Sequence, residues 1–225
     1  MLGIYSFQKF STLDFPGRLA AIIWFSGCNM RCPYCYNKDV VFGQKQIEED
    51  EILKFLKKRA GLLDGVSFTG GEATLYKNLI PFSQKIKDLG FDIKLDTNGI
   101  NFDVIKDIVK QNLADYIALD FKAPPEKFES ITKNKNFKKF EKTLDFLIGS
   151  DVDFEVRTTV HTDLLDENDI NEIIKILHQK GYEGTYYLQN YFETEKETIG
   201  NIGPQKRKLN TSKLLDLIPL GFRNF

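Results

Sequence analysis

The sequence has little of what marks a nucleic-acid-binding, membrane or secreted protein. Among 225 residues, 31 basic side chains nearly balance 32 acidic ones, so the chain lacks the positive surplus that binding to nucleic-acid phosphates requires. The uncharged stretch 19–30 is 12 residues long, whereas a membrane-spanning helix needs about 20. Residues 1–10 lack the basic-then-apolar order of a secretory signal. We therefore expect a cytoplasmic protein that binds neither nucleic acid nor a membrane.

Cysteine is scarce, and its three copies are not spread along the chain. Cys28, Cys32 and Cys35 lie within eight residues of one another. An odd number excludes a framework in which every cysteine is paired in a disulfide. Thiolates bind soft metals, and three of them in a short loop can hold either a zinc ion or an iron–sulfur cluster. Three unrelated buried cysteines are the alternative, but random placement rarely gathers them so tightly.

Histidine is scarcer still, with only His161 and His178. A closed zinc site needs four ligands, so zinc would have to take one of these histidines from a distant segment. An iron–sulfur cube held by three thiolates instead leaves one iron open for a substrate or cofactor. Both metals remain open on this evidence. His161 is more typical of a hydrogen-bonded structural residue than of a proton shuttle.

What the sequence does contain is a regular alternation of apolar and amphipathic runs. Short runs rich in Ile, Val, Phe or Tyr predict six strands, at 19–25, 66–69, 92–96, 116–121, 154–159 and 185–189. Amphipathic runs predict six helices, at 48–60, 75–89, 103–111, 137–149, 167–180 and 212–217. This order implies parallel strands with right-handed crossovers, and eight such units would need about 250 residues. We expect an α/β fold, an open (β/α)6 partial barrel, as a single domain over residues 1–225.

Polar and glycine-rich residues follow the predicted strands. They include the cysteine loop 27–37, then 69–72, 96–99, 120–122, 157–161 and 189–191. In parallel α/β folds the carboxyl ends of the strands form the edge that carries the functional site. Six successive polar strand ends therefore predict one connected site.

The spacing Cys28-x3-Cys32-x2-Cys35, with Tyr34 just before the third cysteine, resembles the signature of the radical S-adenosylmethionine (SAM) superfamily. The stretch Gly70-Gly71-Glu72 is similar to that superfamily's glycine-glycine-glutamate motif, which faces the SAM amino group. Glycines permit close backbone approach, and a carboxylate complements an ammonium group. The resemblance covers almost the whole chain. It implies a 4Fe–4S cluster held by the three cysteines, with SAM at the open iron.

Four further stretches, 13–17, 32–37, 95–99 and 119–122, resemble activases of glycyl radical enzymes. The resemblance is closest to activating proteins of anaerobic ribonucleoside-triphosphate reductase, and next to those of pyruvate formate-lyase. It implies a glycyl radical enzyme as the protein substrate and a flavodoxin or ferredoxin as the electron donor. It also implies that the cluster and SAM carry the chemistry, so that no side chain is catalytic.

The resemblance also gives roles to individual residues. It implies that Lys122 pairs with the SAM carboxylate and that Arg157 lies near the nucleoside. It implies a monovalent cation held by Asp96, Thr97 and Asp120. The predicted cofactor-binding set is completed by Tyr34, Asn37, Gly70, Gly71, Glu72 and Asn98. Ordinary strand-end caps and surface ion pairs are the alternative interpretation of these polar residues.

Two residues depart from the activase pattern. Ala73 stands where proline usually follows the glutamate, and Tyr36 stands where histidine commonly follows the third cysteine. A small-molecule radical SAM enzyme, such as 7-carboxy-7-deazaguanine synthase, therefore stays open as an alternative. A non-catalytic zinc-binding protein is a second one. The combination of the motifs at 14–17, 96–99 and 120–122 favours the activase.

Overall fold

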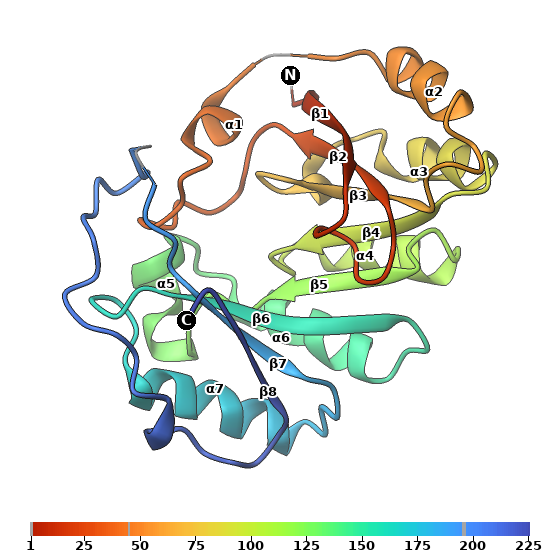
Figure 1. Cartoon of the computed structure of the whole chain (residues 1–225). Coiled ribbons are helices and arrows are strands. Elements are labelled where there is room, and N and C mark those ends of the chain that lie inside the picture. Colours follow the sequence, from red (N-terminus) through yellow and green to blue (C-terminus); the bar gives the residue numbers. More distant parts are fainter. Residues whose placement is uncertain (1, 45, 195–196) are drawn as a thin grey trace. The chain divides into compact units, whose positions relative to one another are not determined.

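The chain folds into two compact units. The computed structural model describes residues 2–44, 46–194 and 197–225. Unit 1 comprises Met1–Asn29, Asn37–Thr97 and Asn101–Ala118, and unit 2 comprises Met30–Tyr36, Asn98–Ile100 and Leu119–Phe225. Strands and helices alternate along the chain in both units (Figure 1). The organisation as a single domain over residues 1–225 stays a prediction.

The strands of unit 1 are β1 (Ile4–Ser11), β2 (Ala20–Phe25), β3 (Gly65–Gly70) and β4 (Asp92–Thr97). β1 pairs antiparallel with β2, whereas β2, β3 and β4 pair in parallel. β2 and β3 are mostly buried, as expected for short apolar strands of a parallel sheet that is covered on both faces. In the register of this pair Phe25 lies beside Gly70, so the segments that follow the two strands start side by side.

Unit 1 also contains α1 (Lys38–Phe42), α2 (Glu49–Lys57), the 3-10 turn η1 (Ala73–Leu75), α3 (Leu79–Lys87) and α4 (Phe102–Lys110). Aromatic rings join strands and helix in the core of this unit. The Phe68 ring centroid lies 5.3 Å from that of Phe25 and 6.0 Å from that of Phe82. These contacts tie β2, β3 and α3 together and hold the ends of the two strands in place.

Unit 2 contains the parallel strands β6 (Asp153–Val160), β7 (Tyr186–Asn190) and β8 (Leu220–Arg223). Its helices are α5 (Pro125–Thr132), α6 (Phe137–Ile148), α7 (Glu167–Gln179) and the 3-10 turn η2 (Thr211–Lys213). A buried aromatic cluster, in which the rings of Phe121 and Phe140 lie 4.6 Å apart, packs α6 against the segment after β5. Among the described residues, no helix is long and apolar enough to cross a membrane.

Strand β5 (Tyr116–Asp120) belongs to both units, with its first three residues in unit 1 and its last two in unit 2. Neighbouring strands follow the chain order from β1 to β8, so the order has two ends. The predicted α/β fold with parallel strands in an open arrangement is confirmed. All six predicted strands are present, as β2 to β7.

Other predictions from the sequence need correction. The strands β1 and β8 and the helices α1 and α5 were not expected. The predicted helix 212–217 is wrong, because only the turn η2 forms and the backbone is extended again at Leu214, with ψ of 145°. The cause is Asn171 of α7, whose side chain accepts from the Leu215 N–H at 2.8 Å and donates to the Lys213 carbonyl at 3.0 Å. These main-chain groups are thereby taken from a local helix.

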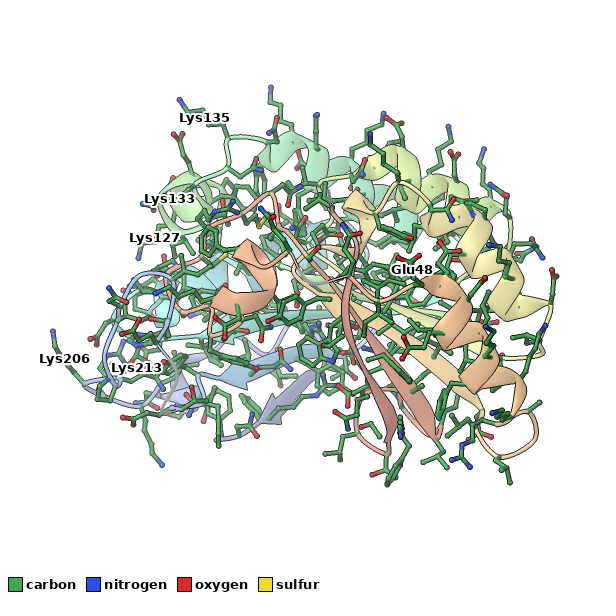
Figure 2. The ribbon with its side chains drawn as sticks, turned by 90° about the horizontal axis from the view of Figure 1, so that it is seen from above. Glu48, Lys127, Lys133, Lys135, Lys206 and Lys213 are labelled. Atoms are coloured by element: carbon green, nitrogen blue, oxygen red, sulfur yellow. The ribbon has the colours of Figure 1, made fainter. Side chains whose placement is uncertain are left out.

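Long basic side chains of unit 2 lie in solvent. Figure 2 shows Lys135 and Lys206 pointing away from the ribbon, and their side chains are 82% and 87% exposed. Each lies near an acidic group, with Lys135 Nζ 3.5 Å from Glu129 and Lys206 Nζ 3.7 Å from Asp163. Exposed pairs of this kind contribute little to stability or recognition.

Candidate active site

The first part of the cysteine loop belongs to unit 1 and is held by main-chain hydrogen bonds. Gly27 has a φ of +82°, in the left-handed region that glycine adopts without strain. Its N–H donates to the carbonyl of Val40 at 3.0 Å, and its carbonyl accepts from the Glu72 N–H at 2.8 Å. Cys28 follows directly and is half-buried. These two main-chain hydrogen bonds of Gly27 therefore fix the backbone just before Cys28, and they do not depend on the identity of any side chain.

The two glycines after β3 pack backbone to backbone against β2 and the cysteine loop. Gly70 has a φ of +116°, and a Cβ there would lie 2.5 Å from the Phe25 nitrogen. A Cβ on Gly71 would lie 1.8 Å from the Gly27 carbonyl oxygen. The Gly71 N–H donates to the Phe25 carbonyl at 2.9 Å. The close approach that glycine was expected to permit is thus made, in this structure, to the loop that carries Cys28.

Glu72 is a buried carboxylate, 2% exposed, that is satisfied by neutral donors. Its Oε1 accepts from Thr74 N at 3.2 Å, from Thr74 Oγ1 at 2.6 Å and from Thr97 Oγ1 at 2.8 Å. Burying a carboxylate is costly unless it is hydrogen-bonded, and these bonds offset the cost while fixing the side chain. The structure brings together the predicted Glu72 and Thr97. Thr74 was not predicted, although a carboxylate two residues before it is a common cap.

Asp96 of β4 has a protein cation as its partner. It forms an ion pair with Lys94 Nζ and accepts from Thr69 Oγ1 at 3.1 Å. Lys94 is 3% exposed and was not predicted as a site residue, although residues two apart in a strand share a face. The monovalent-cation site stays a prediction, and in this structure Asp96 already lies beside an ammonium group.

The second part of the cysteine loop, Met30–Tyr36, belongs to unit 2. Its backbone turns at Cys35, whose N–H donates to the Cys32 carbonyl at 3.1 Å. The Arg31 N–H donates to the carbonyl of Thr132 at the end of α5, at 2.8 Å. Cys32 is buried and Cys35 is half-buried. The loop therefore carries its last two thiols on a turn anchored to a helix.

Tyr34 lies inside this turn and is 5% exposed. Its hydroxyl is buried and makes no hydrogen bond of ordinary geometry, although the Cys32 thiol affects the pKa of this hydroxyl. Burial first, and then the charge of Cys32, hold the pKa of Tyr34 well above its usual value. Burial also raises the pKa of the Cys32 thiol, while the Lys122 ammonium acts in the opposite direction. Tyr34 stays a predicted cofactor-binding residue, and most of its surface is covered in this structure.

Asp120, Lys122 and Arg157 form one ionic group in unit 2. Asp120 Oδ1 lies 2.6 Å from Arg157 Nε, and its Oδ2 lies 3.0 Å from Lys122 Nζ. The three side chains are only 14–18% exposed. Burial disfavours the Asp120 carboxylate, but the Arg157 and then the Lys122 cation outweigh it and hold the pKa of Asp120 far below its usual range. Burial likewise opposes the Lys122 ammonium, but Asp120 raises the pKa of Lys122 above its usual value.

Two predicted asparagines hold local turns. The Asn37 carbonyl accepts from the N–H groups of Val40 and Val41, at 3.0 and 2.9 Å, and thereby starts α1. Asn98 is buried, and its Oδ1 accepts from the Ile100 N–H at 3.2 Å. In this structure both residues shape the loops after β2 and β4.

His161 is bonded at both ring nitrogens. Its Nε2 lies 3.0 Å from the Gly203 carbonyl, and its Nδ1 accepts from the Asp163 N–H at 3.3 Å. These partners assign the neutral tautomer with the proton on Nε2. The side chain is buried beside Tyr191, with ring centroids 4.8 Å apart. These contacts suit a structural residue, and the role of His161 stays a prediction.

The donor set fits an iron–sulfur cluster by its chemistry. One loop supplies three thiols, and thiolates are the ligands that hold iron–sulfur clusters in proteins. Within the part of the chain that the structure describes, no three His, Cys, Asp or Glu side chains are gathered closely enough to hold a metal ion.

Comparison with known proteins decides between these chemistries. The family model of the Radical SAM superfamily matches residues 22–179. The chain belongs to the radical SAM superfamily. This superfamily uses a 4Fe–4S cluster and SAM, and the spacing of Cys28, Cys32 and Cys35 fits its cysteine motif. The zinc-binding alternative is thereby removed, and the chain is a radical SAM enzyme.

Relatives with named activities indicate which kinds of radical SAM protein this chain is similar to. The chain is 35% identical over 175 residues to MJ1227 of Methanocaldococcus jannaschii, provisionally named a glycyl-radical enzyme activating enzyme, and the match covers 73% of this chain and 71% of that protein. It is 32% identical over 126 residues to the pyruvate formate-lyase-activating enzyme of Clostridium pasteurianum, covering 53% of this chain and 52% of that enzyme. The chain thus spans about half of this second relative. The crystal structure of Streptococcus suis SuiB shares the fold, with a TM-score of 0.64 at 12% identity, covering 88% of this chain and 47% of that one.

Proposed function

We propose that this radical SAM protein activates a glycyl radical enzyme. The observation that carries the proposal is the cysteine loop itself, whose first cysteine is fixed by the backbone of Gly70-Gly71-Glu72 and whose second is under the influence of Lys122. A 4Fe–4S cluster held by Cys28, Cys32 and Cys35 would, when reduced, provide the electron for cleavage of SAM to methionine and a 5′-deoxyadenosyl radical, and this radical would take a hydrogen atom from a glycine of the partner. The similarity to MJ1227 supports this choice of substrate.

The chain's own residues bind and orient rather than transfer protons. We assign Cys28, Cys32 and Cys35 as the cluster ligands. Glu72 suits the ammonium group of SAM, because its carboxylate is already oriented by the hydroxyl donors of Thr74 and Thr97. Lys122 suits the SAM carboxylate, since Asp120 keeps the lysine protonated.

Arg157 and the remaining predicted residues have supporting roles in this proposal. Arg157 Nε donates to Asp120 Oδ1 at 2.6 Å, and this ion pair would orient the guanidinium for its proposed place near the nucleoside. The backbone-defining residues Gly70, Gly71, Asn37 and Asn98 shape the loops, and Asp96 and Thr97 support β4 and Glu72. Tyr34 fills the turn that carries the last two cysteines.

Two glycyl radical enzymes are candidates for the partner. We propose anaerobic ribonucleoside-triphosphate reductase first, on the motifs of the sequence. Pyruvate formate-lyase is the second candidate, favoured by the identity to the Clostridium pasteurianum enzyme. A flavodoxin or ferredoxin is proposed as the electron donor.

The test is made with anaerobically purified and reconstituted protein. Reduced protein with SAM is expected to release 5′-deoxyadenosine, and addition of the correct partner is expected to produce a glycyl radical signal by electron paramagnetic resonance. Cys35→Ser is the matched control, because it removes one ligand from the half-buried end of the loop. SAM cleavage that no glycyl radical enzyme stimulates, but that a small molecule does, would overturn the activase assignment and favour an enzyme such as 7-carboxy-7-deazaguanine synthase.

A further inference from the structure

A segment near the end of the chain binds the cysteine loop of unit 2. The Ile199 N–H donates to the carbonyl of Cys35, and the Gly200 N–H donates to the carbonyl of Pro33, both at 2.9 Å. We call residues 198–201 the tail clamp. It lies more than 160 positions along the sequence from the loop that it contacts. The two accepting carbonyls belong to the third cysteine and to the residue after the second, so the clamp contacts the part of the loop that carries two thiols.

Gly200 makes the contact possible because it has no side chain. A Cβ at this position would lie 2.4 Å from Pro33 Cβ and 2.7 Å from Pro33 Cα. Pro33 cannot move aside easily, since its ring fixes its own φ. At Gly203, three residues further, an added Cβ would have nothing within 4 Å, so the same chain segment offers a glycine without this constraint.

The tail clamp is a hydrogen-bonded turn rather than an extended segment. Thr198 is 2% exposed, and its Oγ1 accepts from the Ile202 N–H at 3.0 Å. The Asn201 N–H donates to the Thr198 carbonyl at 3.1 Å, and Asn201 has a φ of +49°, in the left-handed region that asparagine tolerates. The turn thus presents the N–H groups of Ile199 and Gly200 in a fixed direction.

The clamp fixes two peptide planes of the loop. In a trans peptide the N–H points opposite to the carbonyl. With the carbonyls of Pro33 and Cys35 bonded to the clamp, the N–H groups of Tyr34 and Tyr36 are directed away from it. On the other side of Cys32 the Arg31 N–H is bonded to Thr132. The loop segment with the last two cysteines is therefore held at both ends.

We propose that the tail clamp is a positioning element for the iron–sulfur cluster. This inference rests on the proposed cluster ligation by Cys32 and Cys35. Groups that orient metal ligands from outside the ligand set control the affinity for the metal, and hydrogen bonds and exposure around the sulfurs set the reduction potential of a cluster. By holding the peptides beside two cysteines, the clamp controls both how tightly the cluster is retained and how easily it is reduced.

The test compares Gly200→Ala with Gly203→Ala in the full-length chain. Both add one methyl group to the same segment, but only the first meets Pro33. After anaerobic reconstitution, Gly200→Ala is expected to lose iron to a chelator about 10-fold faster than Gly203→Ala and to show a shifted midpoint potential. Far-ultraviolet circular dichroism and thermal unfolding of the apoproteins provide the check on folding. Equal iron retention and equal potential in the two variants would overturn the proposal.

Hydrogen exchange on the unmodified protein gives a second test that needs no variant. If the clamp and the cluster loop act together, cluster loading should slow exchange of the Ile199 and Gly200 N–H groups, which lie outside the ligand set. Unchanged exchange at these amides on loading would overturn the proposal even if Gly200→Ala fails to fold. Failure of the unmodified protein to bind iron would instead refute the proposed function, so the two failures are distinguishable.

Discussion

Each of the two units contains a largely buried carboxylate, and the two carboxylates are stabilised by different kinds of partner. In unit 1, Glu72 accepts hydrogen bonds from the hydroxyls of Thr74 and Thr97, which are neutral. In unit 2, Asp120 lies between two cations, Lys122 and Arg157. Hydroxyl groups act on Glu72 as dipoles, whereas Asp120 is held by full positive charges, and the Arg157 guanidinium also lies 3.9 Å from Glu155.

The difference matters for a zwitterionic ligand. The amino-acid end of SAM carries an ammonium and a carboxylate, and a site for it needs one acceptor with negative charge and one cation. In the proposed function, Glu72 is the acceptor for the ammonium group and Lys122 is the cation for the carboxylate. Two other largely buried carboxylates form ion pairs as well: Asp96 pairs with Lys94, and Glu155 binds Arg223 at 2.7 Å.

The largest effect is expected from Asp120→Asn. This change leaves the two cations near each other without their shared carboxylate, and uncompensated buried charge typically costs about 3 kcal/mol or more in the free energy of unfolding. Urea denaturation of the apoprotein measures the loss. If Asp120→Asn were as stable as the unmodified protein, the claim that the two cations depend on Asp120 would be wrong.

The same ion group predicts a dependence on acid. The folded-state pKa of Asp120 is depressed, so its contribution to stability is present above the unfolded-state pKa of about 3.9 and is lost as the pH falls below it. The stability difference between the unmodified protein and Asp120→Asn should therefore be constant from pH 8 to about 5 and shrink below about pH 4. Denaturation curves at several pH values measure it, and a difference that grows in acid would contradict the depressed pKa.

Glu72→Gln should act on binding more than on folding. The amide oxygen still accepts from the threonine hydroxyls, but the charge that complements an ammonium group is lost. Hydrogen bonds to charged groups contribute about 1.5–3 kcal/mol, so the dissociation constant for SAM should rise about 10- to 100-fold. Equilibrium binding to the reconstituted protein gives this constant. Unimpaired SAM binding would remove Glu72 from the cofactor-binding set.

The smallest effect is expected from Thr97→Val. It removes one of the donors to Glu72 while Thr74 keeps the others, so we expect a loss of about 1 kcal/mol in the free energy of unfolding. Chemical denaturation alongside Thr74→Val, which removes the 2.6 Å hydroxyl bond, ranks the two donors. A larger loss for Thr97→Val than for Asp120→Asn would reverse the comparison between the units.

The parts of the fold with strong patterns were predictable. The strands β2 to β7 are short apolar runs, and such runs in alternation with amphipathic helices indicate parallel strands. β1 was missed because its residues after Ile4 are partly exposed and mixed in character, as antiparallel edge strands are. β8 was missed because four residues give too little pattern for a strand prediction.

The site was predictable where a motif follows a strand, and not where the contact is made by the backbone. Cys28, Glu72 and Asp120 were predicted to lie at or just after the ends of strands, and the structure has them there, at the ends of β2, β3 and β5. Lys94 was missed because a lysine within a strand is ordinarily exposed. The tail clamp was missed because its contacts with the loop are main-chain hydrogen bonds, which leave almost no trace in residue types.

The packing of Gly71 on the Gly27 carbonyl has a consequence for how this chain can vary. A contact between two backbones transmits position without depending on any side chain, so substitutions around it are tolerated while the glycine itself is not. In a saturation library, position 71 should therefore behave as an all-or-none site, whereas position 203, where an added Cβ meets nothing within 4 Å, should accept graded replacement.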